Sequence, residues 1–122
     1  MKRDYVSFLV DIVKAIDDIF IFINDMDFNQ FTIDRKTFFA VVQRFTSIGE
    51  AVKKLPENLK DKYSLVPWKT IAGMRDNLVH EYYNIESKIL WMTIQSNLTT
   101  LKLQILQVIE DLKKIKDQEK LG

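Results

Sequence analysis

One short stretch in the second half of the sequence gathers the side chains best suited to chemistry. It reads Met-Arg-Asp-Asn-Leu-Val-His-Glu-Tyr, and its reactive members are Arg75, Asp76, Asn77, His80 and Tyr82. Arginine offers a fixed positive charge and a fork of donors that suits a phosphate. His80, the only histidine in the chain, can transfer a proton near neutral pH. The stretch is therefore a candidate acid–base site that acts on a phosphate.

Arginine and histidine together suffice to cleave RNA without a metal ion, because the 2′-hydroxyl of RNA can attack the adjacent phosphate. His80 would help to deprotonate that hydroxyl or would protonate the leaving oxygen. Arg75 would stabilise the negative charge on the phosphorane. Asp76 or Asn77 would orient the imidazole, since they precede His80 by four and three residues and lie beside it on a helix.

The same spacing leaves a second interpretation open. On a helix, Arg75 and His80 lie about 140° apart around the axis, so one ligand meets both only if it lies across the helix. A lone histidine paired with Asp76 on an ordinary surface helix would give the same pattern, and such pairs are common.

Helical periodicity runs through nearly the whole sequence and predicts an all-α fold. Apolar residues recur three or four positions apart in four segments, which predicts helices over about 5–23, 35–55, 67–83 and 84–116. The stripe on the last helix is wider than a coiled-coil seam, which favours a bundle of helices. The first helix is apolar over so broad an arc that its second side needs a further helix or a second subunit.

Local signals mark where these helices begin and end. Asp34 is suited to cap the second helix, and Ile33 and Phe38 occupy the positions of a hydrophobic staple around that cap. Pro56 marks the end of this helix, and Pro67 suits the first turn of the third. The segments 24–33 and 56–66 are expected as connections. Gly73, inside the third helix, is expected to permit the close approach of another backbone. Trp68 and Trp91 are expected as core anchors.

Composition excludes several classes of function. The chain has 122 residues, no cysteine and one histidine, which excludes disulfides, thiolate zinc sites and sites built on paired histidines. No apolar run is longer than that of residues 19–23, which is too short to cross a bilayer, and acidic residues break any signal-peptide core. We expect a soluble cytoplasmic protein without membrane contact or cofactor. The net charge is only +1, but residues 51–75 carry six basic and two acidic side chains.

The motif and its surroundings resemble the HepT-like branch of the HEPN superfamily, small α-helical toxins encoded beside a minimal nucleotidyltransferase. The branch carries Arg-x4-His-x-Tyr, which matches Arg75, His80 and Tyr82. The string Pro-Trp-x-x-Ile-x-Gly-Met-Arg-x-x-Leu-Val-His-x-Tyr is the specific part. The resemblance spans about residues 4–112 and includes Ile-Gly-Glu-Ala at 48–51.

The resemblance implies an antiparallel four-helix bundle of HEPN type that acts as a homodimeric, metal-independent ribonuclease with the two motif helices lining a shared cleft. Arg75 and His80 carry over as catalytic residues, Asp76 as an orienting residue with Asn77 in support, and Tyr82 as the site that the nucleotidyltransferase antitoxin modifies with AMP. The added phosphates would block the RNA path by charge and bulk. Each subunit would bring its positive 51–75 segment to the RNA.

Two rival functions remain open on the sequence. The chain could be a non-catalytic helical dimer that docks and regulates a partner nucleotidyltransferase, although retention of both Arg75 and His80 favours catalysis. Alternatively the nucleotidyltransferase is the harmful component and this chain restrains it. In either case we expect one helical domain over residues 1–116, followed by a charged, frayed tail over 117–122.

Overall fold

The computed structural model describes residues 4–81 and 85–121, with side chains described as far as residue 119. Within these residues all regular structure is helical, which confirms the predicted all-α class. In chain order the helices are α1 (Tyr5–Phe22), α2 (Phe28–Ile33), α3 (Arg35–Lys53), α4 (Glu57–Lys62), α5 (Trp68–Glu81) and α6 (Ser87–Leu121). The four long ones correspond to the four predicted helices.

Two segments expected as connections each contain a short helix. The helix α2 begins with a capping box, because the Asp27 carboxylate accepts from the backbone N–H of Gln30 at 2.8 Å and the Gln30 side chain accepts from the backbone N–H of Asp27 at 2.8 Å. The ring of Phe31 anchors this helix and is fully buried. The second short helix, α4, follows Pro56 and buries Leu59.

The predicted cap of α3 is confirmed, whereas the prediction of a hydrophobic staple between Ile33 and Phe38 is wrong. The carboxylate of Asp34 accepts from the backbone N–H of Thr37 at 3.0 Å, and this bond lowers the pKa of Asp34. Ile33 is 80% exposed, so it is not packed on the helix. The ring that contacts Phe38 is instead Phe31, with 6.1 Å between centroids. The hydrophobic contact across the cap therefore comes from α2.

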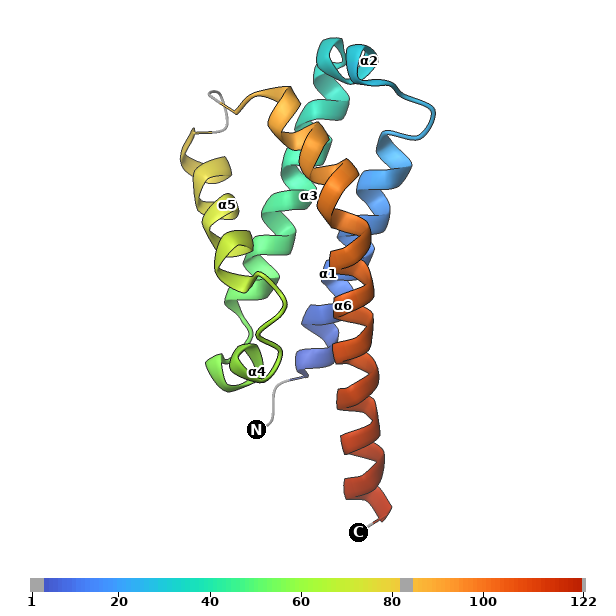
Figure 1. Cartoon of the computed structure of the whole chain (residues 1–122), viewed down its shortest axis with the longest axis vertical. Helices are drawn as coiled ribbons and strands as arrows, with labels where there is room; N and C mark the ends of the chain where they lie inside the picture. The colour runs from blue at the N-terminus through green and yellow to red at the C-terminus, as the bar shows by residue number, and fades with distance from the viewer. Residues whose placement is uncertain (1–3, 82–84, 122) are drawn as a thin grey trace.

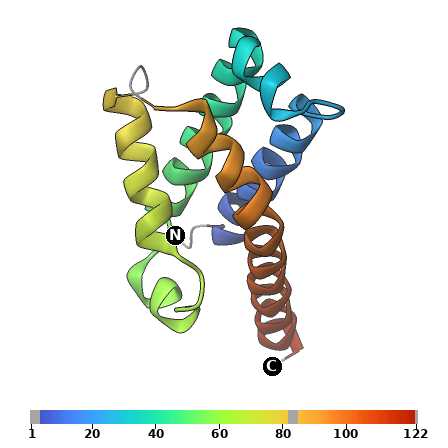
Figure 2. The ribbon, with the colours of Figure 1, turned by 45° about the horizontal axis from the view of Figure 1, so that its top comes forward.

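The long helices pack in an order that explains the broad apolar arc of α1. Helix α1 contacts both α3 and α6, and α3 also contacts α5 (Figure 1). Two views place α5 on the outer side of α3, away from α1 (Figure 2). Leu9, Ile12, Ile16 and Ile19 of α1 are at most 1% exposed in this core. The second side of α1 is thus covered within the chain, and its breadth no longer argues for a dimer.

Helix α6 extends well beyond the rest of the molecule at its C-terminal end (Figure 1). Its apolar stripe is buried as far as Val108 and Ile109, and from Lys113 to residue 119 every side chain is exposed. The helix continues to Leu121 and so includes residues 117–121, which were expected as a tail after the helical domain. In the described part of the chain, no helix has both the length and the apolar character needed to cross a bilayer.

Candidate functional site

Helix α5 carries the reactive stretch and is fixed to the core through its first turn and one face. Pro67 stands at the start as predicted, with its carbonyl accepting from the backbone N–H of Ile71 at 3.1 Å. The Trp68 indole is buried and donates to the carbonyls of Lys60 and Tyr63 at 3.2 and 3.1 Å. Leu78 is 1% exposed. These anchors confirm Trp68 as a core residue and fix the rotation of the helix.

The opposite face of α5 is open to solvent. Four of the exposed residues of α5 are spaced four, four and three positions apart and so form one line along the helix: Lys69, Gly73, Asn77 and His80. Neither Asn77 nor His80 makes a side-chain hydrogen bond or ion pair with any other described residue. The imidazole that the sequence proposes for proton transfer is thus accessible, and no described group of this chain orients it.

Arg75 lies on the seam between α5 and α3, where a glycine makes room for it. A Cβ atom placed on Gly49 would stand 2.1 Å from the Cβ and 2.7 Å from the Cγ of Arg75, closer than real atoms approach. The close approach of two helices therefore occurs at Gly49. Our expectation for Gly73 was wrong within this chain, because a Cβ there would meet nothing within 4 Å.

The guanidinium of Arg75 turns from this seam towards two carboxylates. Its Nη1 donates to Oδ1 of Asp76 at 3.0 Å, and its Nη2 lies 3.7 Å from Oε1 of Glu50 on α3. Its Nε is buried without a hydrogen-bond partner among the described residues. The side chain is 25% exposed. The edge that Nη1 and Nη2 form is therefore the part that can bind an anion from solvent.

Asp76 is engaged by cations and not by the histidine. Its Oδ1 accepts from Nζ of Lys53 on α3 and from Nη1 of Arg75. Hydrogen bonding from Lys53 first, and from Arg75 second, lowers the pKa of the Asp76 carboxyl. The predicted contact of Asp76 with His80 does not occur among the described residues. Asp76 instead holds Arg75 in place and links it to α3.

The structure thus adds Gly49, Glu50 and Lys53 of α3 to the predicted residues of α5. Gly49 and Glu50 belong to the string at 48–51 quoted for the resemblance, and Lys53 belongs to the basic segment, but neither signal indicated a contact with Arg75. Tyr82, the predicted modification site, lies outside the described residues. It follows Glu81, where α5 ends.

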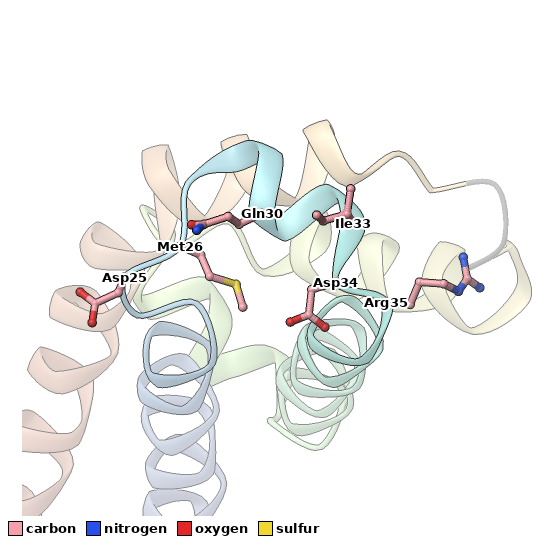
Figure 3. Close-up of a pocket in the computed structure, with 6 residues that line it drawn as sticks. All are labelled: Asp25, Met26, Gln30, Ile33, Asp34 and Arg35. Carbon is pink, nitrogen blue, oxygen red and sulfur yellow. The ribbon is translucent and has the colours of Figure 1, made fainter.

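A separate shallow hollow, open to solvent, lies at the junction of α2 with the N-terminal end of α3 and has a volume of about 710 Å³. Its lining residues are Asp25, Met26, Gln30, Ile33, Asp34 and Arg35, and in Figure 3 Arg35 points away from the others. Gln30 and Asp34 already serve as helix caps. None of the predicted site residues lines this hollow.

The space that Gly49 leaves for Arg75, which we call the notch at Gly49, gives a prediction about the free energy of unfolding. Gly49→Ala should lower the free energy of unfolding by about 1–3 kcal/mol, because the added methyl overpacks the contact with Arg75 and outweighs the better helix propensity of alanine. Gly73→Ala is the matched control and should gain up to about 1 kcal/mol, because its site is open. Urea unfolding measures both. Equal stability gains in the two variants would show that no notch exists.

The sequence is similar to proteins named as ribonucleases. A family model described as "Ribonuclease HepT-like" matches residues 12–117. The chain is 39% identical over 111 residues to "Putative RNase MJ0125" of Methanocaldococcus jannaschii, which covers 91% of this chain and 96% of the relative. It is 38% identical over 102 residues to "Probable ribonuclease HepT" of Thermococcus cleftensis, which covers 84% of this chain and 93% of the relative. No solved structure matches the chain.

Proposed function

The chain belongs to the HepT-like ribonuclease family, and on this premise we propose that it is the RNA-cleaving toxin of a toxin–antitoxin pair. Membership of the family supports a ribonuclease with an RNA substrate. The cleavage mechanism, the dimer and the antitoxin are the further parts of the proposal. They depend on the chemistry of α5 described above.

In the proposed reaction His80 takes the proton of the 2′-hydroxyl or gives one to the leaving 5′-oxygen, and water accepts or donates the other proton. The 2′-oxygen bonds to the adjacent phosphorus, the bond to the 5′-oxygen breaks, and a 2′,3′-cyclic phosphate and a 5′-hydroxyl remain. Arg75 binds the non-bridging oxygens, whose negative charge increases in the phosphorane. Neither role needs a metal ion, because the proton carrier and the positive charge are both side chains.

The observation that carries this proposal is the arrangement of Arg75 and His80 on one helix. The guanidinium edge is held at the surface between α3 and α5, and the backbone of His80, whose side chain is exposed, follows that of Arg75 about 7.5 Å further along the axis. A polynucleotide that crosses α5 would bring one phosphodiester within reach of both. Asp76 then acts on Arg75 as a positioning residue, and Asn77 stands as a supporting residue on the exposed face.

The active form is proposed to be a homodimer in which the α5 helices of two copies line one cleft. Apolar side chains that remain exposed near the end of α5 and the start of α6 support a covered surface there: Val79 at 42%, Ile89 at 53% and Met92 at 54%. Two copies would also bring basic side chains of two 51–75 segments to the RNA, but not Lys54, whose Nζ lies over the ring of Phe8 on α1.

Cleavage of a defined RNA by the purified protein in excess EDTA tests the activity. We expect product ends that carry a 2′,3′-cyclic phosphate and a 5′-hydroxyl, identified by mass spectrometry. RNA that is bound but never cut would favour a non-catalytic dimer that regulates a nucleotidyltransferase. Cleavage that requires an added divalent ion would contradict the proposed mechanism.

Modification of Tyr82 is the proposed means of neutralisation. Co-expression with a minimal nucleotidyltransferase encoded beside the gene should add AMP to Tyr82 and stop RNA cleavage, because the added phosphates would compete with the RNA phosphate. Intact-mass and peptide mass spectrometry measure the modification. Tyr82→Phe should escape it. Loss of activity on co-expression without any added mass would indicate neutralisation by contact alone.

A further inference from the structure

We propose that Lys53 on α3 is a second phosphate-binding residue of this site and acts beside Arg75. The inference deepens the proposed ribonuclease function and rests on it. The motif on α5 offers only one permanent cation, Arg75, and the structure supplies another from a helix far away in the sequence.

Lys53 and Arg75 meet on a single oxygen atom. Nζ of Lys53 and Nη1 of Arg75 both donate to Oδ1 of Asp76. An ammonium and a guanidinium that share one carboxylate oxygen are close enough to share one phosphate group as well. Asp76 thus holds the two cations at the spacing that an anion with several oxygens can bridge.

Both cations keep donors available for a ligand. An ammonium has three N–H donors, and Lys53 uses one on Asp76 while its side chain is 41% exposed. Nη2 of Arg75 lies 3.7 Å from Oε1 of Glu50, beyond hydrogen-bond distance, so a phosphate oxygen can take its protons. A phosphodiester could therefore bind without displacing Asp76.

Lys53 also offsets the net negative charge of the groups around Arg75. Two carboxylates, Glu50 and Asp76, flank the guanidinium, so this trio alone carries a net negative charge that would repel RNA. Lys53 brings the cluster to neutrality. A phosphodiester carries one negative charge and its phosphorane carries more, so two cations at the reacting phosphate stabilise the later state more strongly.

The neighbouring lysine provides a matched control. Lys54 has the same charge and an exposed side chain, but its Nζ lies over the ring of Phe8 on α1, 5.4 Å from the centroid. It therefore points away from Arg75. Lys53→Met and Lys54→Met remove one charge each from adjacent positions on α3, and Lys53→Arg keeps the charge.

Binding of a fluorescent 2′-O-methyl RNA oligonucleotide, which lacks the attacking hydroxyl, tests the inference apart from catalysis. Anisotropy titrations at several salt concentrations should show that Lys53→Met binds about tenfold more weakly than wild type, with a salt slope smaller by about 0.7. Lys54→Met and Lys53→Arg should stay within about threefold of wild type. Thermal unfolding by circular dichroism confirms that each variant is folded. Equal binding by Lys53→Met and Lys54→Met would overturn the inference.

A double variant separates direct binding from an effect through Asp76. If Lys53 served only to neutralise Asp76, Lys53→Met combined with Asp76→Asn would bind RNA like wild type, and that result would overturn the inference. We expect the double variant to remain weak. If wild type cleaves RNA and Lys53→Met binds and cleaves it equally well, the inference about Lys53 is overturned. The proposed ribonuclease function then still holds. Wild-type protein that neither binds nor cleaves RNA would overturn both.

Discussion

Replacing His80 by alanine should abolish RNA cleavage without unfolding the protein. A positioned acid or base contributes about 10²–10⁴-fold to a rate, and His80 is the only side chain of the motif that can transfer a proton near neutral pH. The imidazole is exposed and makes no side-chain hydrogen bond with the other described residues, so its loss breaks none of their hydrogen bonds and should leave the fold intact. Single-turnover cleavage of a defined RNA measures the loss, and the melting temperature measures the fold.

Glu81→Ala is a suitable control, because Glu81 is the exposed neighbour of His80 and has no part in the proposed chemistry. It should cleave RNA at the wild-type rate. If His80→Ala cleaved at a comparable rate, the assignment of the proton carrier would be wrong, and the exposed imidazole would be an ordinary surface histidine.

Replacing Arg75 by lysine should lower kcat by about 10²–10³-fold, as the loss of a donor to a developing anion does in other enzymes. Lysine keeps one positive charge and the Cβ and Cγ that fill the notch at Gly49, so the variant should fold. It loses the planar fork whose two nitrogens face Asp76 and Glu50. Steady-state kinetics separate the expected fall in kcat from a weaker effect on KM.

The outcome of Arg75→Lys distinguishes a catalytic fork from a general positive charge. A variant with unchanged kcat and raised KM would show that Arg75 only attracts the RNA. Free guanidinium added to Arg75→Ala offers a second test, because partial recovery of cleavage is expected if the fork itself stabilises the phosphorane.

Much of the fold follows from local patterns in the sequence. The 3.6-residue period of apolar side chains is long and regular in α1, α3 and α6, and a cap such as Asp34 acts through neighbouring residues. The short helix α2 went unpredicted because six residues give no period to read, although Asp27 and Gln30 form a capping box. The partners of α1 depend on tertiary packing, which periodicity alone does not specify.

The candidate site likewise has a part that the sequence predicts and a part that depends on tertiary packing. Arg75 and His80 are identified by residue type and spacing on one helix, and the helix is confirmed. The residues of α3 depend on how α3 and α5 align, which brings Gly49 against Arg75 and Lys53 against Asp76. No local signal indicates that register. For this reason the helical spacing predicted that Asp76 contacts His80, whereas the Asp76 carboxylate binds Lys53 and Arg75.

In the proposed mechanism the 2′-hydroxyl of RNA is the nucleophile, and Arg75 and His80 promote its attack. The most direct measurement compares cleavage of one RNA with cleavage of the same RNA bearing a single 2′-O-methyl group at the cleaved position, in excess EDTA. We predict that the unmodified RNA is cut at that position and that the methylated RNA stays intact there. Equal cutting of both substrates at that position would contradict this account.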